Sequence, residues 1–107
     1  MGAEDIELIS RVIREREGCD CKHLKTVPIK EEFEGKTIWQ GEVEVFEIAG
    51  HDRARFCYGW GYLEDGGKRM VHLIFGIPPV DSPQKAVQVF IANTEREQRE
   101  QQKLGET

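Results

Sequence analysis

The sequence predicts an α+β domain in which an antiparallel meander of three or four strands packs an N-terminal and a C-terminal helix on one face. Apolar residues recur with helical spacing near both ends of the chain, whereas the middle alternates between apolar and polar residues. Short glycine-containing turns separate the alternating segments, which indicates antiparallel strands. A length of 107 residues suffices for one domain and leaves no room for a second core.

The first helix is predicted over residues 3–17. Ile6, Ile9 and Ile13 recur at helical spacing with charged residues between them, which is typical of an amphipathic helix. Gly18 follows the last apolar position, where glycine adopts the left-handed conformation that ends a helix at the lowest cost.

The second helix is predicted to begin at Ser82-Pro83, with the hydroxyl as N-cap and proline in the first turn. Beyond Glu95 apolar residues almost vanish. We therefore expect one domain over residues 1–96 and a polar tail without fixed structure over 97–107. The inward stripe of this helix is expected to consist of Ala86, Val87, Phe90, Ile91 and Thr94.

The first two strands are less regular. Residues 19–29 contain few apolar side chains, and Pro28 removes a backbone donor, so we expect a loop leading into an edge strand over 26–33. A half-buried strand follows over 37–48. Its alternation changes phase at Val45-Phe46, which predicts a β-bulge or the end of the sheet face.

The third strand, over 54–64, has an unusual division between its two faces. The fourth, over 69–77, is apolar on both faces and should therefore be covered on both. One face of the third strand carries Phe56, Tyr58, Trp60 and Tyr62, and the other carries Cys57, Gly59 and Gly61.

The aromatic face has three possible roles: a core beneath the helices, a surface for a second copy or another protein, or a platform for stacked bases. We expect a small binding or interaction module that associates with itself or with a protein partner through this face. His72 also fits a half-buried structural histidine. The residues predicted for the interaction surface are Tyr58, Trp60, Tyr62, Met70 and His72.

Charge and segment composition limit the partners. Twenty acidic and fifteen basic residues give a net charge of −5, which argues against binding nucleic acid or anionic lipid through bulk charge. The acidic start resembles no signal peptide, and no apolar run approaches the roughly 20 residues that span a bilayer. We expect a cytoplasmic protein without a membrane partner.

If the first strand is discounted, the α-β-β-β-α order and the loop Gly50-His51 before Phe56 resemble the double-stranded RNA-binding domain. That resemblance implies an RNA surface formed by a helix face, a loop histidine and a lysine cluster at the last helix. Here the last helix offers one lysine, so we carry over the fold pattern and keep RNA binding as an alternative. The residues for that alternative are His51, Arg53, Arg55 and Lys85.

A second resemblance implies no activity. The stretch from Gly35-Lys36-Thr37-Ile38-Trp39 through Val80-Asp81-Ser82-Pro83 is similar to small bacterial proteins without an assigned function.

The cysteines suggest a further alternative. Cys19, Cys21 and His23 are closely spaced, and Cys57 or His51 could complete a tetrahedral zinc site. No second closely spaced ligand pair exists in the chain, so we expect free thiols and no cofactor.

Catalysis is the least favoured role. The one candidate cluster is His51, Asp52 and Cys57, and neighbouring side chains in an extended segment point apart. We therefore expect no catalytic residues and a protein that binds rather than reacts.

Overall fold

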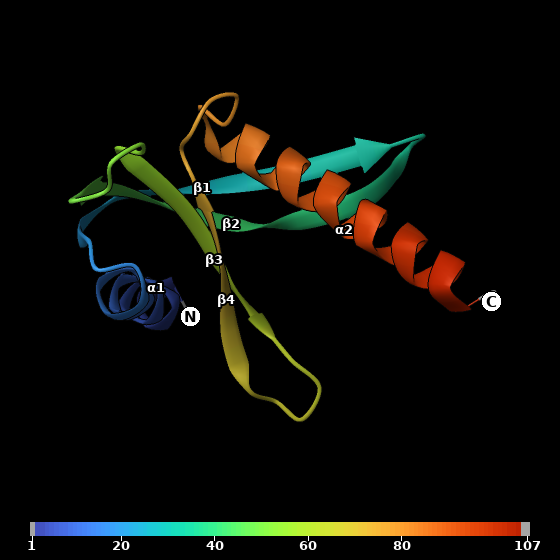
Figure 1. The fold of residues 1–107 in the computed structure, drawn as a ribbon, viewed down its shortest axis with the longest axis horizontal. Helices are drawn as coiled ribbons and strands as arrows, with labels where there is room; N and C mark the ends of the chain where they lie inside the picture. Colours follow the sequence, from blue (N-terminus) through green and yellow to red (C-terminus); the bar gives the residue numbers. More distant parts are fainter. Residues whose placement is uncertain (1, 106–107) are drawn as a thin grey trace.

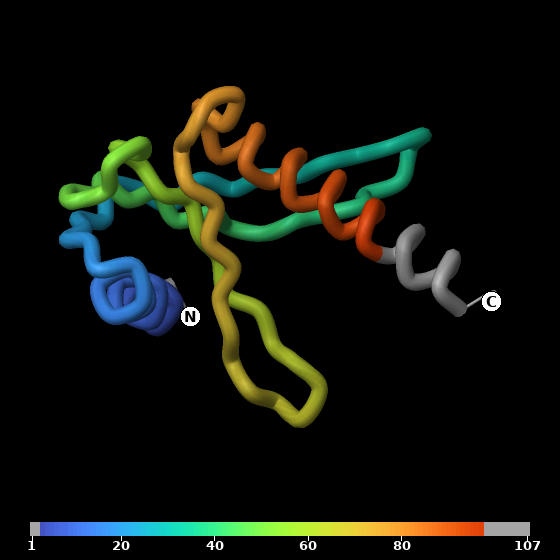
Figure 2. Tube along the Cα trace, viewed as in Figure 1, coloured from blue at the N-terminus to red at the C-terminus, as the bar shows by residue number. Residues whose placement is uncertain are grey.

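The computed structural model describes residues 2–105, with side chains placed for residues 3–97. Two terminal helices flank one antiparallel sheet with strand order β1-β2-β3-β4, as Figures 1 and 2 show. This confirms the predicted α+β class, the meander and both helices. Within the described part of the chain, no helix has the length and apolarity needed to cross a membrane. In chain order the elements are α1 (Gly2–Arg16), β1 (Asp20–Phe33), β2 (Lys36–Ala49), β3 (Phe56–Leu63), β4 (Arg69–Phe75) and α2 (Pro83–Gly105).

The two helices pack on opposite faces of the sheet, so the expectation that both lie on one face is wrong. Ile9 and Ile13 of α1 pack in a buried cluster with Phe46 and Cys57. A separate cluster beneath α2 contains Val87. The other buried members of this second cluster are Ile29, Val43, Val45, Tyr58, Trp60, Val80 and Ala86. In Figure 1, α1 and α2 accordingly lie on different sides of the β3–β4 hairpin.

Because α1 and α2 cover opposite faces of β2, the alternation of apolar and polar residues along this strand changes phase. Val43 and Val45 face α2, whereas Phe46 and Ile48 face α1. All four side chains are buried. The register of the ladder shifts opposite Val45-Phe46, but the extra residue, Leu24, lies in the partner strand β1 between His23 and Lys25, and β2 itself continues to Ala49. A strand covered on both faces needs no bulge to bury consecutive apolar residues.

The first strand is longer than the sequence predicts. Residues 20–33 all belong to β1, so the expected loop over 19–29 is wrong. Ladder pairing with β2, from Asp20–Ala49 to Phe33–Lys36, stabilises a segment whose own side chains are mostly exposed. Because β1 is an edge strand, Pro28 is tolerated there. The presence of β1 also removes the three-strand order on which the resemblance to the RNA-binding fold depends.

The predicted end of α1 and the predicted start of α2 are confirmed. Gly18 has φ +68°, and Cys19 donates its backbone N–H to the carbonyl of Ile13, as in a glycine-ended helix. Ser82 Oγ accepts the backbone N–H of Lys85 at 3.2 Å, which caps α2. The expected tail over 97–107 falls almost wholly outside the residues whose side chains are described, and it stays a prediction.

A buried carboxylate lies beneath α1. Glu44 of β2 is 2% exposed. Its Oε1 accepts the hydroxyl of Thr26 at 2.5 Å and lies 2.9 Å from His23 Nε2. The register shift in β1 brings both partners to the same face as Glu44, with Leu24 at 44% exposure between them. Such partners are required, because an unpartnered buried carboxylate would be strongly destabilising.

We predict that Glu44→Ala lowers the free energy of unfolding by about 2–4 kcal/mol, because it leaves a cavity and removes the acceptor of Thr26 and His23. Glu42→Ala is the matched control, since Glu42 is exposed on the same strand; it should change stability by less than about 0.5 kcal/mol. Urea denaturation followed by circular dichroism measures both. Equal losses in the two variants would contradict the assigned role of Glu44.

Candidate functional site

The main candidate site is a slot where the sheet divides. β2 and β3 pair over four residues only, from Glu44–Gly59 to Glu47–Phe56. Beyond Glu44, β2 stays paired with β1 and β3 stays paired with β4, and the two hairpins diverge (Figure 1). The slot has a volume of about 550 Å³ and lies between the diverging strands.

The lining of the slot reaches the backbone edges of both strands. Four consecutive residues of β2, 39–42, and three of β3, Trp60–Tyr62, line it. Side chains of consecutive strand residues point to opposite faces, so a cavity shared by three or more in a row adjoins the strand edge itself. Within the described residues, neither edge pairs with another strand here. Each strand contributes one glycine to the lining, Gly41 and Gly61.

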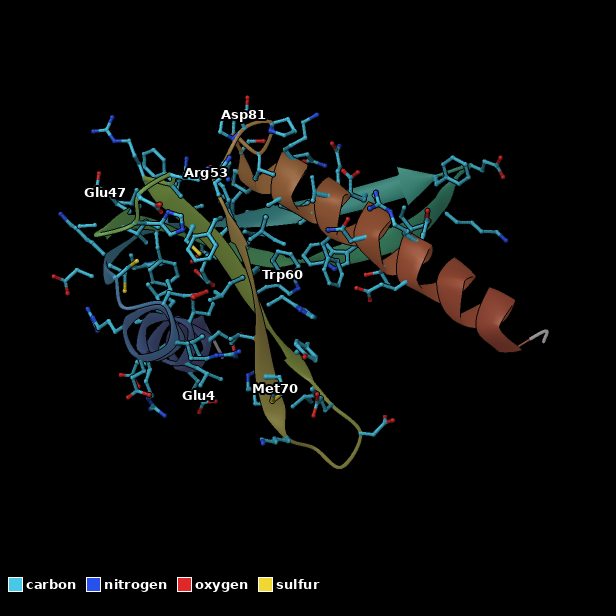
Figure 3. The ribbon with its side chains drawn as sticks, viewed as in Figure 1. Glu4, Glu47, Arg53, Trp60, Met70 and Asp81 are labelled. Carbon is cyan, nitrogen blue, oxygen red and sulfur yellow. The ribbon has the colours of Figure 1, made fainter. Side chains whose placement is uncertain are left out.

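Aromatic rings form one wall of the slot. Trp60 lies between β3 and α2 in Figure 3 and is 5% exposed, so it forms the floor. Trp39 lies against it edge to face at 5.3 Å between centroids and 72° between planes. Phe90 of α2 meets Trp60 at 5.2 Å and 85°. The half-exposed rings of Trp39 and Phe90 thus stand at steep angles to a common neighbour.

His72 belongs to the same wall. Its ring stacks on Tyr62 with centroids 4.2 Å apart and planes inclined by 11°, and it lies 4.6 Å from the ring of Phe90. Burial lowers the pKa of His72 below its ordinary value of 6.5. The imidazole is therefore neutral at pH 7, and this wall carries no positive charge.

An ion pair borders the slot on the α1 side. Arg69 Nε and Nη2 of β4 donate to the two carboxylate oxygens of Asp5 at 2.5 and 2.6 Å. The Asp5 carboxylate lies so close to Gly61 that a side chain at that position would collide with it. Glu42, on the opposite border, is exposed. Apart from the Asp5–Arg69 pair, the charged residue in the lining is therefore Glu42, a carboxylate.

The five residues predicted for the interaction surface are divided by the fold. Trp60, Tyr62 and His72 line the slot. Tyr58 is 4% exposed in the core beneath α2, where burial, with the charge of Asp81 secondary, raises the pKa of its hydroxyl. Met70 is half-buried on β4 outside the lining, near the end of the hairpin in Figure 3. Tyr58 and Trp60 are thus core residues, which is one of the three roles considered for the aromatic face.

The residues predicted for nucleic-acid binding are apart from the slot. His51 holds its own loop, since its Nδ1 accepts the backbone N–H groups of Arg53 at 3.0 Å and Ala54 at 2.9 Å. The ring also packs against Phe75 at 4.7 Å. Arg53, Arg55 and Lys85 are exposed. RNA binding through these residues stays a prediction.

The four residues of the predicted zinc site have separate partners. Sγ of Cys19 donates to the carbonyl of Glu17 and Sγ of Cys21 to that of Ser10, whereas His23 pairs with Glu44. Within residues 2–105, no three potential donors are grouped to hold a metal ion.

Cys57 is suited to packing rather than to nucleophilic chemistry. It is fully buried on the α1 face of β3. Burial, with a further contribution from the charge of Glu17, raises the pKa of its thiol to about 12. A thiol that stays protonated at neutral pH is a poor nucleophile.

Comparisons of the chain with protein-family profiles, with curated proteins and with solved structures found no match. The slot is therefore the feature of this protein that indicates a function.

Sequence reasoning missed eight of the eleven residues that line the slot. One signal was available: Trp39-Gln40-Gly41 and Trp60-Gly61-Tyr62 each combine a tryptophan with a glycine on a strand. No sequence signal identifies the residues that α1, β4 and α2 contribute, because tertiary packing brings them to the slot. The missed residues are Asp5, Trp39, Gln40, Gly41, Glu42, Gly61, Arg69 and Phe90.

The lowered pKa of His72 predicts a pH effect on stability. The unfolded chain takes up a proton near pH 6.5 and the folded protein only at lower pH, so this histidine makes stability fall as pH drops through that window. His72→Gln should weaken the fall. Urea titrations at about pH 7.5 and about pH 5.5 measure the difference. An identical pH dependence in wild type and variant would refute this assignment.

Proposed function

We propose that the protein is a binding module that captures an extended peptide segment in the slot between β2 and β3. The main support is that the slot adjoins two strand edges that no strand of the described chain pairs with. An extended peptide adds to such an edge through backbone hydrogen bonds, and pockets beside the edge select its alternate side chains.

The lining supports this form of recognition. Gly41 and Gly61 bring one strand edge each to the slot, with the ring of Trp39 against Gly41 and the carboxylate of Asp5 against Gly61. Trp39, Tyr62 and Phe90 supply large, partly exposed rings beside the edges. Aromatic anchors of this kind provide most of the contact energy in many interfaces. The slot would thus combine main-chain pairing with anchoring of one side chain.

An acetylated and amidated peptide of about seven alternating threonine and valine residues, with norleucine at its centre, tests this function. We expect titration into the ¹⁵N-labelled full chain to shift the amide signals of Gly41 and Gly61 and the indole signal of Trp39. The amide signals of Gly18 and Gly50, outside the slot, should stay in place. Trp39→Ala should weaken binding, whereas Ile38→Ala, an exposed neighbour outside the slot, should not.

The peptide backbone offers a second control. Two peptides are compared, one N-methylated at its odd-numbered amides and one at its even-numbered amides. One of them should lose binding and the other should keep it, because only every second residue directs its N–H toward the paired edge. Absence of binding, or shifts that gather elsewhere, would refute the proposal. If the slot signals instead move with protein concentration without peptide, a second copy of the chain is the occupant, which would replace the peptide proposal with self-association.

A further inference from the structure

The rings in the slot present faces in different directions around one space. Trp39 and Phe90 meet Trp60 at 72° and 85°, so the three rings behave as adjoining walls rather than as a stack. The face of an aromatic ring carries negative potential and its edge carries positive potential. A cation within about 6 Å of such a face is attracted, by up to about 2 kcal/mol where water is excluded.

The rings face α2, whereas the charged side chains of the lining lie on the α1 face of the sheet, so these charges act on a ligand between the rings only at longer range. Asp5 and Arg69 neutralise each other through two hydrogen bonds. Glu42 has no ion-pair partner among the residues that the structure describes. Glu4 adds a second carboxylate near Arg69, whose pKa is raised first by its hydrogen bond to Asp5 and then by these charges. With a net charge of −5 on the chain, an anionic ligand would be repelled.

We propose that the slot selects a partner segment that carries a bulky organic cation, an N-methylated ammonium or a guanidinium group, on the side chain that enters between Trp39, Tyr62 and Phe90. Glu42, whose side chain alternates to the opposite face of β2 from Trp39, adds negative charge only at longer range. This inference rests on the proposed function, because it names the side chain that the added strand places in the slot. A large, weakly hydrated cation loses little hydration on entering, which favours it over an unmodified ammonium.

The test compares four peptides that differ at the central position of the threonine-valine segment: trimethyl-lysine, arginine, unmodified lysine and the neutral norleucine. Binding to the full chain is followed by tryptophan emission, since both tryptophans line the slot. We expect trimethyl-lysine or arginine to bind at least about 10-fold more tightly than norleucine at low salt. Whichever of these two peptides binds more tightly identifies the preferred cation, and the peptide with unmodified lysine should bind more weakly than it.

Three variants test where the preference arises. Glu42→Gln should reduce the ratio of cation to norleucine affinity by less than about 2-fold, because Glu42 lies on the opposite face of β2 from Trp39. Trp39→Leu should reduce the ratio further while keeping apolar bulk. Glu47→Gln is the matched control, because Glu47 is exposed on the same strand outside the slot and should leave the ratio unchanged.

The outcomes separate this inference from the proposed function. Equal affinity for the cationic and norleucine peptides overturns the cation preference and leaves peptide binding intact. A preference that survives Trp39→Leu also overturns it, since the selectivity then originates elsewhere. No binding of any peptide refutes the proposed function itself.

Discussion

The ladder between β2 and β3 is the constraint on which the architecture depends. It spans only Glu44–Glu47 and Phe56–Gly59, yet it joins the β1–β2 hairpin to the β3–β4 hairpin. Its inner residues are covered from both sides, with Phe46 and Cys57 beneath α1 and Val45 and Tyr58 beneath α2. Because the ladder ends early, the two hairpins diverge, and the same short junction that stabilises the core opens the slot.

Close approach of α1 to β3 connects the core to the slot. At Gly59 an added side chain would lie 3.2 Å from Cγ2 of Ile9 and 3.0 Å from Cδ2 of Leu73, so the helix lies almost on the strand backbone. This proximity brings Asp5 to Gly61 and lets it pair with Arg69. The glycines of β3 therefore act on the fold and the site together: they admit α1 on one side and leave a backbone edge open on the other.

The distribution of apolar residues is explained by the position of the helices. β2 and β4 are apolar on both faces, a surplus that a sheet with helices on one face would leave exposed. With α1 and α2 on opposite faces, Phe46 and Leu73 pack under one helix and Val45 and Ile74 under the other. The helices thus cover the sheet faces, and the aromatic surface that is left for a partner consists of the half-exposed rings beside the free strand edges.

The sequence by itself determined the α+β class, both helices, the end of α1, the start of α2 and three of the four strands, because capping, turns and side-chain periodicity act over a few neighbouring residues. It also indicated that the aromatic residues of β3 matter, although it could not divide Tyr58 in the core from Tyr62 in the slot. Only the tertiary structure decided the face on which each helix packs, the full length of β1 and the joining of Asp5, Trp39, Arg69 and Phe90 around one space. These features depend on contacts between residues far apart in the chain, which local patterns do not encode.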